Sequence, residues 1–343
     1  MSVKVWDGSN AEWDTSYWFT ASNGMSEAET IALDNKQGAP EAGDTVYVSN
    51  AAGPNQPTTI PAAVTVANYT SYGLNYDTGA NLTVSDTLTM GTVAGIDSPV
   101  FSGTALAGCV VVFRGGSNNS GTVGNLALFK DNSVNNGIAG NYAWFESNAY
   151  NTGTVGTDAT FNDLAYNSGT VGTDATFNDL AYNTTYGTVG TDATFNDLAY
   201  NTTYGTVGNL ATFNNSAYNT GTVGTYATFN NSAYNTGTVG NLATFNSDST
   251  AFNGTYTGTQ YYVAAPIVFL NTCQFTGTAP IIFSLTTKLA YVDGKFTSNG
   301  GTTPKRVKVN LDAAAVADLV QANILTGKTI LGVVGAMKRN YAA

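Results

Sequence analysis

The residues best suited to chemistry in this 343-residue sequence are carboxylates that recur at regular spacing. They form two series, which are Asp158, Asp174 and Asp192, and Asp163, Asp179 and Asp197. Two carboxyl groups roughly 5–10 Å apart can hydrolyse a glycosidic bond, and carboxylate oxygens also bind Ca²⁺. A catalytic pair should depart from a repeat, and Glu146, which stands where later copies have Asn, is one such departure. Because the Asp residues belong to the repeat itself, we expect a solvated acidic surface, no enzyme and no cofactor or metal site.

Composition excludes several other functions. The chain has no His, which removes His-based triads and His-ligated zinc. Its net charge of −11 argues against binding nucleic acid through phosphates. No uncharged apolar run reaches the ~18 residues that span a bilayer, and the N-terminus lacks the basic and apolar regions of a signal peptide. We therefore expect no nucleic-acid partner, no membrane insertion and no export signal.

The acidic residues are positioned by an internal repeat. Residues 151–166 read NTGTVGTDATFNDLAY, and residues 167–182 repeat them with one change. Phe recurs at steps of 16 or 18 residues from Phe129 to Phe245. The longer steps contain an inserted Thr–Tyr pair that leaves the other positions intact, so the insertion must lie in a turn. Such a repeat predicts a stack of similar units.

Within one unit, large residues lie five or six positions apart, which is too short for a helix and suits three short strands. Alternate residues of a strand face opposite sides, so Ala159 should point inward beside Phe161, with Thr160 outward. Asn and Gly between the strands should form corners, because both tolerate left-handed backbone. We predict an all-β fold, a parallel β-solenoid (β-helix) of about three-sided coils with 16–18 residues each.

The predicted core consists of three columns of residues that repeat from coil to coil. A Tyr column can instead bind sugar rings on the surface. However, Val134 and Phe252 stand at its two ends without a hydroxyl, which favours the core. The Val column is expected to include Ile138. The core columns are Phe161, Phe177, Phe195, Phe213 and Phe229; Tyr166 and Tyr182; and Val155, Val171 and Val189.

We expect the functional residues at positions where a coil departs from the repeat. Tyr186 and Tyr204 occupy the inserted turns of neighbouring coils, where exposed aromatics suit a contact surface. The position before the inward Ala varies among Asp, Tyr and Leu, which indicates solvent and makes its large residues further candidates. The predicted surface contacts are Tyr186, Tyr204, Leu210, Tyr226 and Leu242.

Composition also divides the chain. Residues 141–260 carry eight acidic and no basic residues, whereas residues 305–343 carry six basic and two acidic ones. We expect a Trp-rich N-terminal cap or attachment segment (1–43), irregular solenoid coils (44–140), regular coils (141–260), apolar terminal coils (261–304) and a basic C-terminal module (305–343). The last is expected to hold a helix at 313–323 and a strand within 327–337.

Three segments resemble tailed-bacteriophage virion appendage proteins. ANILTGKTILGVVGAM at 322–337 is similar to a segment common at the ends of phage tail and fibre proteins, of the form NILxGKTILGVxG. The coils resemble repeats of tail-fibre-like proteins, and VWDGSNAEWDTSYWF followed by GDTVYV resembles the start of such chains. The resemblance implies an elongated virion appendage and carries over no catalytic residues.

These observations predict a structural virion protein that forms a fibre, spike or decoration, with host-surface adhesion as a further role. Its expected partners are other virion proteins, copies of itself (a homotrimer, as phage fibres usually are) and a host-surface glycan. It would assemble in the host cytoplasm. One alternative is a tailspike that binds or cleaves glycans, and a second is a cell-surface adhesin or extracellular filament subunit.

Overall fold

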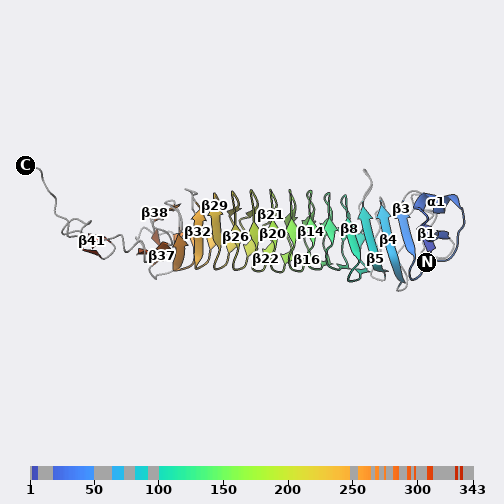
Figure 1. Cartoon of the computed structure of the whole chain (residues 1–343), viewed down its shortest axis with the longest axis horizontal. Coiled ribbons are helices and arrows are strands. Elements are labelled where there is room, and N and C mark those ends of the chain that lie inside the picture. The colour runs from blue at the N-terminus through green and yellow to red at the C-terminus, as the bar shows by residue number, and fades with distance from the viewer. Residues whose placement is uncertain are drawn as a thin grey trace, which may run out of the picture. The chain divides into compact units, whose positions relative to one another are not determined.

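The computed structural model describes residues 2–6, 18–49, 64–72, 82–91, 100–247 and 254–263, and short strands up to residue 334. The chain divides into two compact units. Unit 1 contains residues 1–193 and 204–206, and unit 2 contains residues 194–203 and 207–343. Both consist of parallel β-solenoid coils (Figure 1). The predicted fold class is therefore confirmed.

Unit 1 begins with a small cap. Strands β1 (Ser2–Trp6) and β2 (Trp18–Ser22) pair antiparallel, followed by helix α1 (Glu27–Ala32). Lys4 of β1 is buried, and its ammonium donates to Thr20 Oγ1 at 3.1 Å and to two backbone carbonyls. Burial lowers the pKa of Lys4. Trp6 and Trp18 pack edge to face at 5.2 Å, so two of the three N-terminal Trp residues stabilise this cap.

Longer parallel strands follow the cap. β1 pairs with β3 (Thr45–Ser49), β3 with β4 (Val64–Tyr72), β4 with β5 (Leu82–Gly91), and β5 with β8 (Val110–Phe113). Alternate residues such as Val46, Val66 and Leu88 are fully buried. These strands begin the stack that the shorter repeats continue in unit 1.

Each regular coil of unit 1 contains three two-residue strands, and each strand pairs in parallel with its equivalent one coil later. The short strands are β6 (Val100–Phe101), β7 (Thr104–Ala105), β9 (Asn118–Asn119), β10 (Thr122–Val123), β11 (Leu128–Phe129), β12 (Val134–Asn135), β13 (Ile138–Ala139), β14 (Trp144–Phe145), β15 (Tyr150–Asn151), β16 (Thr154–Val155), β17 (Thr160–Phe161), β18 (Tyr166–Asn167), β19 (Thr170–Val171), β20 (Thr176–Phe177), β21 (Tyr182–Asn183) and β22 (Thr188–Val189).

The interior follows the same rule on two sides of the coil. A small residue and a larger one, two positions apart, are both buried: Ala159 with Phe161, and Ala165 with Asn167. On the third side Val155 is buried and Gly153 is half-buried. The Phe and Val columns lie in the core as predicted, and Thr160 faces outward. In unit 1, the rings of Phe145 and Phe161 stack at 4.7 Å. Complete burial of such a ring stabilises the fold by about 1.5–3 kcal/mol.

The prediction of a Tyr core column is wrong. Tyr166 and Tyr182 lie on the outer side of their strands and are only half-buried, whereas the following Asn residues have no exposed surface. Asn167 Nδ2 donates to Asn183 Oδ1 at 2.8 Å, and its Oδ1 accepts from Asn151 Nδ2 at 2.8 Å. Such a ladder satisfies the buried amides, which removes the penalty that an unpaired polar group would carry.

Two further details of the predicted coil are corrected. Ala139, not Ile138, pairs with Val123 and Val155, and Ile138 is exposed. The left-handed corners are not at the Asn and Gly columns but at Asp158 and Asp163 and their equivalents. Gly153 is required for close approach instead, because a Cβ there would collide with the carbonyl oxygen of Gly137.

Unit 2 is built from the same coil. Its inner ladder joins Asn201 to Asn219 and Asn219 to Asn235, and Asn235 donates to the hydroxyl of Tyr256 at 3.3 Å. The strands from the division onward are β23 (Thr194–Phe195), β24 (Tyr200–Asn201), β25 (Thr206–Val207), β26 (Thr212–Phe213), β27 (Tyr218–Asn219), β28 (Thr222–Val223), β29 (Thr228–Asn231), β30 (Tyr234–Asn235), β31 (Thr238–Val239), β32 (Ala243–Ser247), β33 (Thr255–Tyr256), β34 (Gln260–Val263), β35 (Ile267–Phe269), β36 (Gln274–Phe275), β37 (Ile281–Leu285), β38 (Val292–Gly294), β39 (Thr297–Ser298), β40 (Val307–Leu311), β41 (Thr329–Ile330) and β42 (Val333–Val334).

The C-terminal end differs from the expected module in two respects. β40 pairs in parallel with β37, so residues 307–311 continue the solenoid beyond the expected boundary near 304. β41 and β42 pair antiparallel, which gives two short strands where one was expected. The helix predicted at 313–323 lies outside the described residues.

Candidate functional site

The outer surface of unit 1 departs from the repeat on one side of the coil stack. β8, β11, β14 and β17 pair in register, so Val112, Leu128, Trp144 and Thr160 form one outward column. From Thr160 onward, the column is Thr in every regular coil. The three coils before it therefore replace a hydroxyl surface with large apolar side chains.

Large apolar residues are exposed around this column. They form what we call the aromatic patch, in which Val110 is 60%, Leu126 72%, Tyr142 54% and Trp144 45% exposed. Exposed apolar groups gathered on one surface of a soluble protein mark contact sites more often than isolated ones do. Trp and Tyr also supply much of the binding energy where proteins associate.

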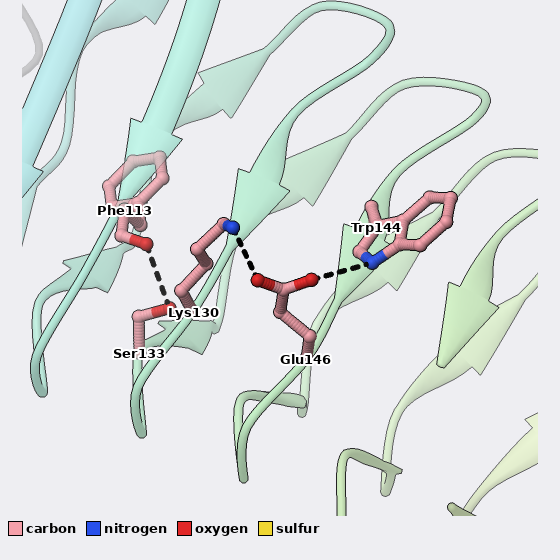
Figure 2. Close-up of polar contacts among 5 residues, drawn as sticks. All are labelled: Phe113, Lys130, Ser133, Trp144 and Glu146. Atoms are coloured by element: carbon pink, nitrogen blue, oxygen red, sulfur yellow. Dashed lines mark hydrogen bonds and ion pairs between the residues drawn. The ribbon is translucent and has the colours of Figure 1, made fainter. Parts of the chain in front are cut away.

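Trp144 is held in place by a chain of polar contacts that Figure 2 shows. Glu146 forms an ion pair with Lys130 through Oε1, and its Oε2 accepts a hydrogen bond from Trp144 Nε1 at 3.1 Å. Because the indole bonds to the side chain two residues ahead, its ring lies along its own strand. Beside Lys130, buried Ser133 donates to the carbonyl of Phe113 at 3.3 Å (Figure 2). Glu146 is thus occupied in fixing an exposed ring.

The patch also gathers the positive charge of this part of the chain. Arg114 and Lys130 are the only basic residues between residues 100 and 247. Each follows an inward Phe, and β8 pairs with β11, so they lie on neighbouring coils. Arg114 is exposed, whereas Lys130 is partly neutralised by Glu146. Arg114 is therefore the exposed cation of the patch, while Lys130 lies beside two carboxylates, Glu146 and the exposed Asp131.

The backbone at two patch residues is strained. Leu126 and Tyr142 have φ of +64° and +59°, in the left-handed region. Later coils of unit 1 place Asp158 and Asp174 at the same position, and Asp tolerates this conformation better than Leu or Tyr. Backbone strain of this kind is concentrated at functional sites. Leu126 and Tyr142 thus combine an unfavourable backbone conformation with an apolar side chain that is exposed to solvent.

The predicted surface contacts are mostly exposed. Tyr186 and Tyr204 are 82% and 72% exposed, and Leu210 and Tyr226 are exposed at left-handed corners. Leu242 is half-buried. Whether any of them binds a partner stays a prediction. Sequence reasoning did not include Leu126, Tyr142 and Trp144 among the contacts, although they occupy the same coil positions as the chosen residues or lie beside them.

The outward Tyr residues form stacked ladders. In unit 1, Tyr150 and Tyr166 stack at 4.7 Å with rings 5° apart, and in unit 2 Tyr200 and Tyr218 stack at 4.7 Å. Partial burial, and then the neighbouring phenols, raise the pKa of Tyr166. Since the ring faces cover one another, the ladder leaves mainly edges and hydroxyls to solvent, which is a poor platform for stacking a sugar.

The two Asp series lie at the corners of the coils. Asp158 Oδ2 accepts from Thr157 Oγ1 at 2.8 Å, and Asp174 Oδ2 accepts from Thr173 Oγ1 at 2.7 Å. Within the part of the chain that the structure describes, no three acidic or thiol side chains are grouped to hold a metal ion. The first Asp series thus bonds locally within its own corners, whereas Asp197 of the second series accepts from Asn215 Nδ2 at 2.9 Å.

A groove opens beside the cap of unit 1. Its floor is the outer side of β1, β3, β4 and β5, and its wall is the segment that leads into α1. The volume is about 470 Å³, and Tyr47, Asn68, Thr70 and Asn23 contribute to the lining. Glu29 also lines it and accepts bonds from Ser26 N and Oγ at 2.8 and 2.7 Å, which lower the pKa of Glu29. The groove offers hydroxyls, amides, one phenol and one carboxylate.

Comparisons with known proteins give no relative. No family model, curated protein or solved structure matches this chain. Among the described residues, α1 with six residues is the only α-helix. The described part of the chain therefore has no helix that is long and apolar enough to cross a membrane. The chemistry of the described surface therefore has to carry any functional proposal.

Proposed function

We propose that this chain is a structural subunit of an elongated appendage on a tailed-bacteriophage particle. Its partners would be other virion proteins and further copies of itself, with a homotrimer favoured. The supporting observation is that the interior of each coil is used for stacking on the next. Val, Phe and Asn columns recur with little change, which suits a stiff spacer better than a catalytic scaffold. The phage-like segment at 322–337 supports the particular kind of particle.

Localisation on purified particles tests this function. An antibody against the recombinant chain should label an appendage of intact phage in electron micrographs, and the chain should copurify with particles through a density gradient. Labelling of a cell surface with no labelling of particles would favour the adhesin or filament alternative. Absence of the chain from particles would refute the proposal.

A second candidate function, adhesion to a host-surface glycan, is favoured by the groove beside α1. Sugars bind through hydroxyl and amide hydrogen bonds together with an aromatic ring, and the lining provides all three. The test is binding of the chain to an array of bacterial surface polysaccharides. Tyr47→Ala should abolish binding, whereas Thr154→Ala, on the exposed surface of a regular coil, should not. Equal binding by both variants, or release of reducing sugars, would contradict simple adhesion at the groove.

A further inference from the structure

The aromatic patch has a counterpart elsewhere on unit 1. After the inward Phe161 and Phe177, the chain turns through a left-handed Asp followed by an exposed Leu. We call Asp163, Leu164, Asp179 and Leu180 the Asp–Leu corner. It combines exposed carboxylates with exposed apolar side chains. The aromatic patch combines exposed apolar side chains with Arg114 and Lys130. Both surfaces therefore expose apolar side chains, and Arg114 of the patch carries a charge opposite to that of the corner carboxylates.

Their spacing also matches. Arg114 and Lys130 lie one coil apart because β8 pairs with β11, and Asp163 and Asp179 lie one coil apart because β17 pairs with β20. Parallel strands are separated by about 4.8 Å, so both series have the same pitch. A second solenoid alongside the first would bring cations and carboxylates into register over two coils at once.

We propose that the aromatic patch of one copy of this chain binds the Asp–Leu corner of a second copy. The two surfaces belong to different coils of one stack, so a single copy cannot pair them. Arg114 and the remaining N–H donors of Lys130 face the corner carboxylates, while Trp144, Tyr142 and Leu126 cover Leu164 and Leu180. This contact relieves the exposure of residues that are also strained in the backbone.

The two surfaces differ, so the contact is heterologous. Each copy carries one of each, and repetition gives a closed ring or an open side-by-side assembly. The inference deepens the homo-oligomeric part of the proposed function and rests on it. It is tested on the purified chain, whereas the phage assignment is tested on particles, so the two can fail separately.

The chain supplies its own matched substitutions. A patch variant, Arg114→Asn with Leu126→Asp and Tyr142→Asp, copies Asn162 and Asp158 of the regular coil. A corner variant, Asp163→Asn and Asp179→Asn with Leu164→Ser and Leu180→Ser, copies Asn215 and Ser216 of a later coil. Both variants use residues that this fold already accepts, and circular dichroism checks that they fold.

Sedimentation velocity then measures assembly of the full chain. We expect the wild type to associate, and each variant to raise the dissociation constant roughly tenfold or more. The two variants mixed should form a one-to-one complex, because each retains the surface that the other lacks. A monomeric wild type, or variants that assemble like the wild type, would overturn the proposal.

Cross-linking provides a measurement that needs no variant. A carbodiimide joins a lysine to a carboxylate in contact, and mixing copies of light and heavy isotopic composition identifies links between chains. Lys130 should be linked to Asp163 or Asp179 of another copy. If wild-type oligomers form without this link, assembly uses other surfaces and the inference is wrong.

Discussion

Two neighbouring coils of unit 1 share an interior and differ in their exterior. The coil of β16–β18 places Val155, Phe161 and Asn167 inward, and the coil of β13–β15 places Ala139, Phe145 and Asn151 inward. Outside, the first coil carries Asp158 and Thr160 where the second carries Tyr142 and Trp144. The interior is constrained by the coil on either side, while the exterior is free to acquire contacts. Stability and function should therefore respond to different substitutions.

The largest expected effect is loss of an inward ring. Phe161→Ala should lower the free energy of unfolding by about 3–5 kcal/mol, because it leaves a cavity between stacked neighbours. Phe145→Ala, in the coil of β13–β15, should lower the free energy of unfolding by about the same amount, since both rings have no exposed surface. Urea denaturation of the two variants measures this. A cost for Phe145→Ala below half that for Phe161→Ala would break the claim that the two interiors are equivalent.

The inner Asn ladder should be the next most sensitive feature. Asn167→Val removes the bonds to Asn151 and Asn183 and leaves their amide groups short of partners, which should cost about 1–3 kcal/mol. The same denaturation experiment measures the change. Thr154→Val, on the exposed side of the same coil, serves as the control and should stay within about 0.5 kcal/mol of wild type. If the two substitutions cost the same, the ladder does not stabilise the fold.

The coil architecture could be predicted from the sequence because it depends on spacing. Insertions of two residues left the Phe column intact, and alternation placed Ala159 and Phe161 inward with Thr160 outward. The same alternation in Ala165–Tyr166–Asn167 indicates an inward Asn. That signal was overridden by the general preference of aromatic residues for burial. Periodicity was the better guide here than residue type.

The Asn ladder and the aromatic patch depend on neighbouring coils. A buried Asn is costly in a single coil and becomes favourable only when the copies above and below provide its partners. Similarly, Lys130, Glu146 and Trp144 are separate exceptions in the sequence, and only the stacking of β11 on β14 brings them together. One coil read alone does not contain this information.

The outer surface of the coils that depart from the repeat gives a prediction of opposite sign, in which a substitution raises the free energy of unfolding. Leu126→Asn should raise the free energy of unfolding by about 1 kcal/mol, because Asn tolerates the left-handed φ that Leu adopts at this corner. Asp158→Asn, at the same position of the regular coil, should be nearly neutral. Thermal unfolding of the two variants gives the comparison. A loss of stability in Leu126→Asn would show that its exposed side chain packs within the monomer.

The smallest expected effect concerns pH and the Tyr ladder. Partial burial, with the neighbouring phenols of Tyr150 and Tyr182, raises the pKa of Tyr166, whereas the coil of β10–β12 has Val134 in this column. A phenol that keeps its proton longer when folded stabilises the protein fully below the unfolded pKa of about 10. This contribution is lost as the pH rises through the folded pKa. Solvent screening at the half-exposed ring keeps the effect small.

The measurement is thermal unfolding of wild type and Tyr166→Val at neutral pH and above pH ~10. Tyr166→Val copies Val134 and removes one phenol from the middle of the ladder, so its midpoint should fall less with rising pH than that of wild type. The wild type loses the preferential protonation of Tyr166, together with the repulsion between adjacent phenolates that full ionisation would create. Equal slopes for the two proteins would mean that the ladder ionises like free tyrosine, and that its stacking leaves the phenols unaffected.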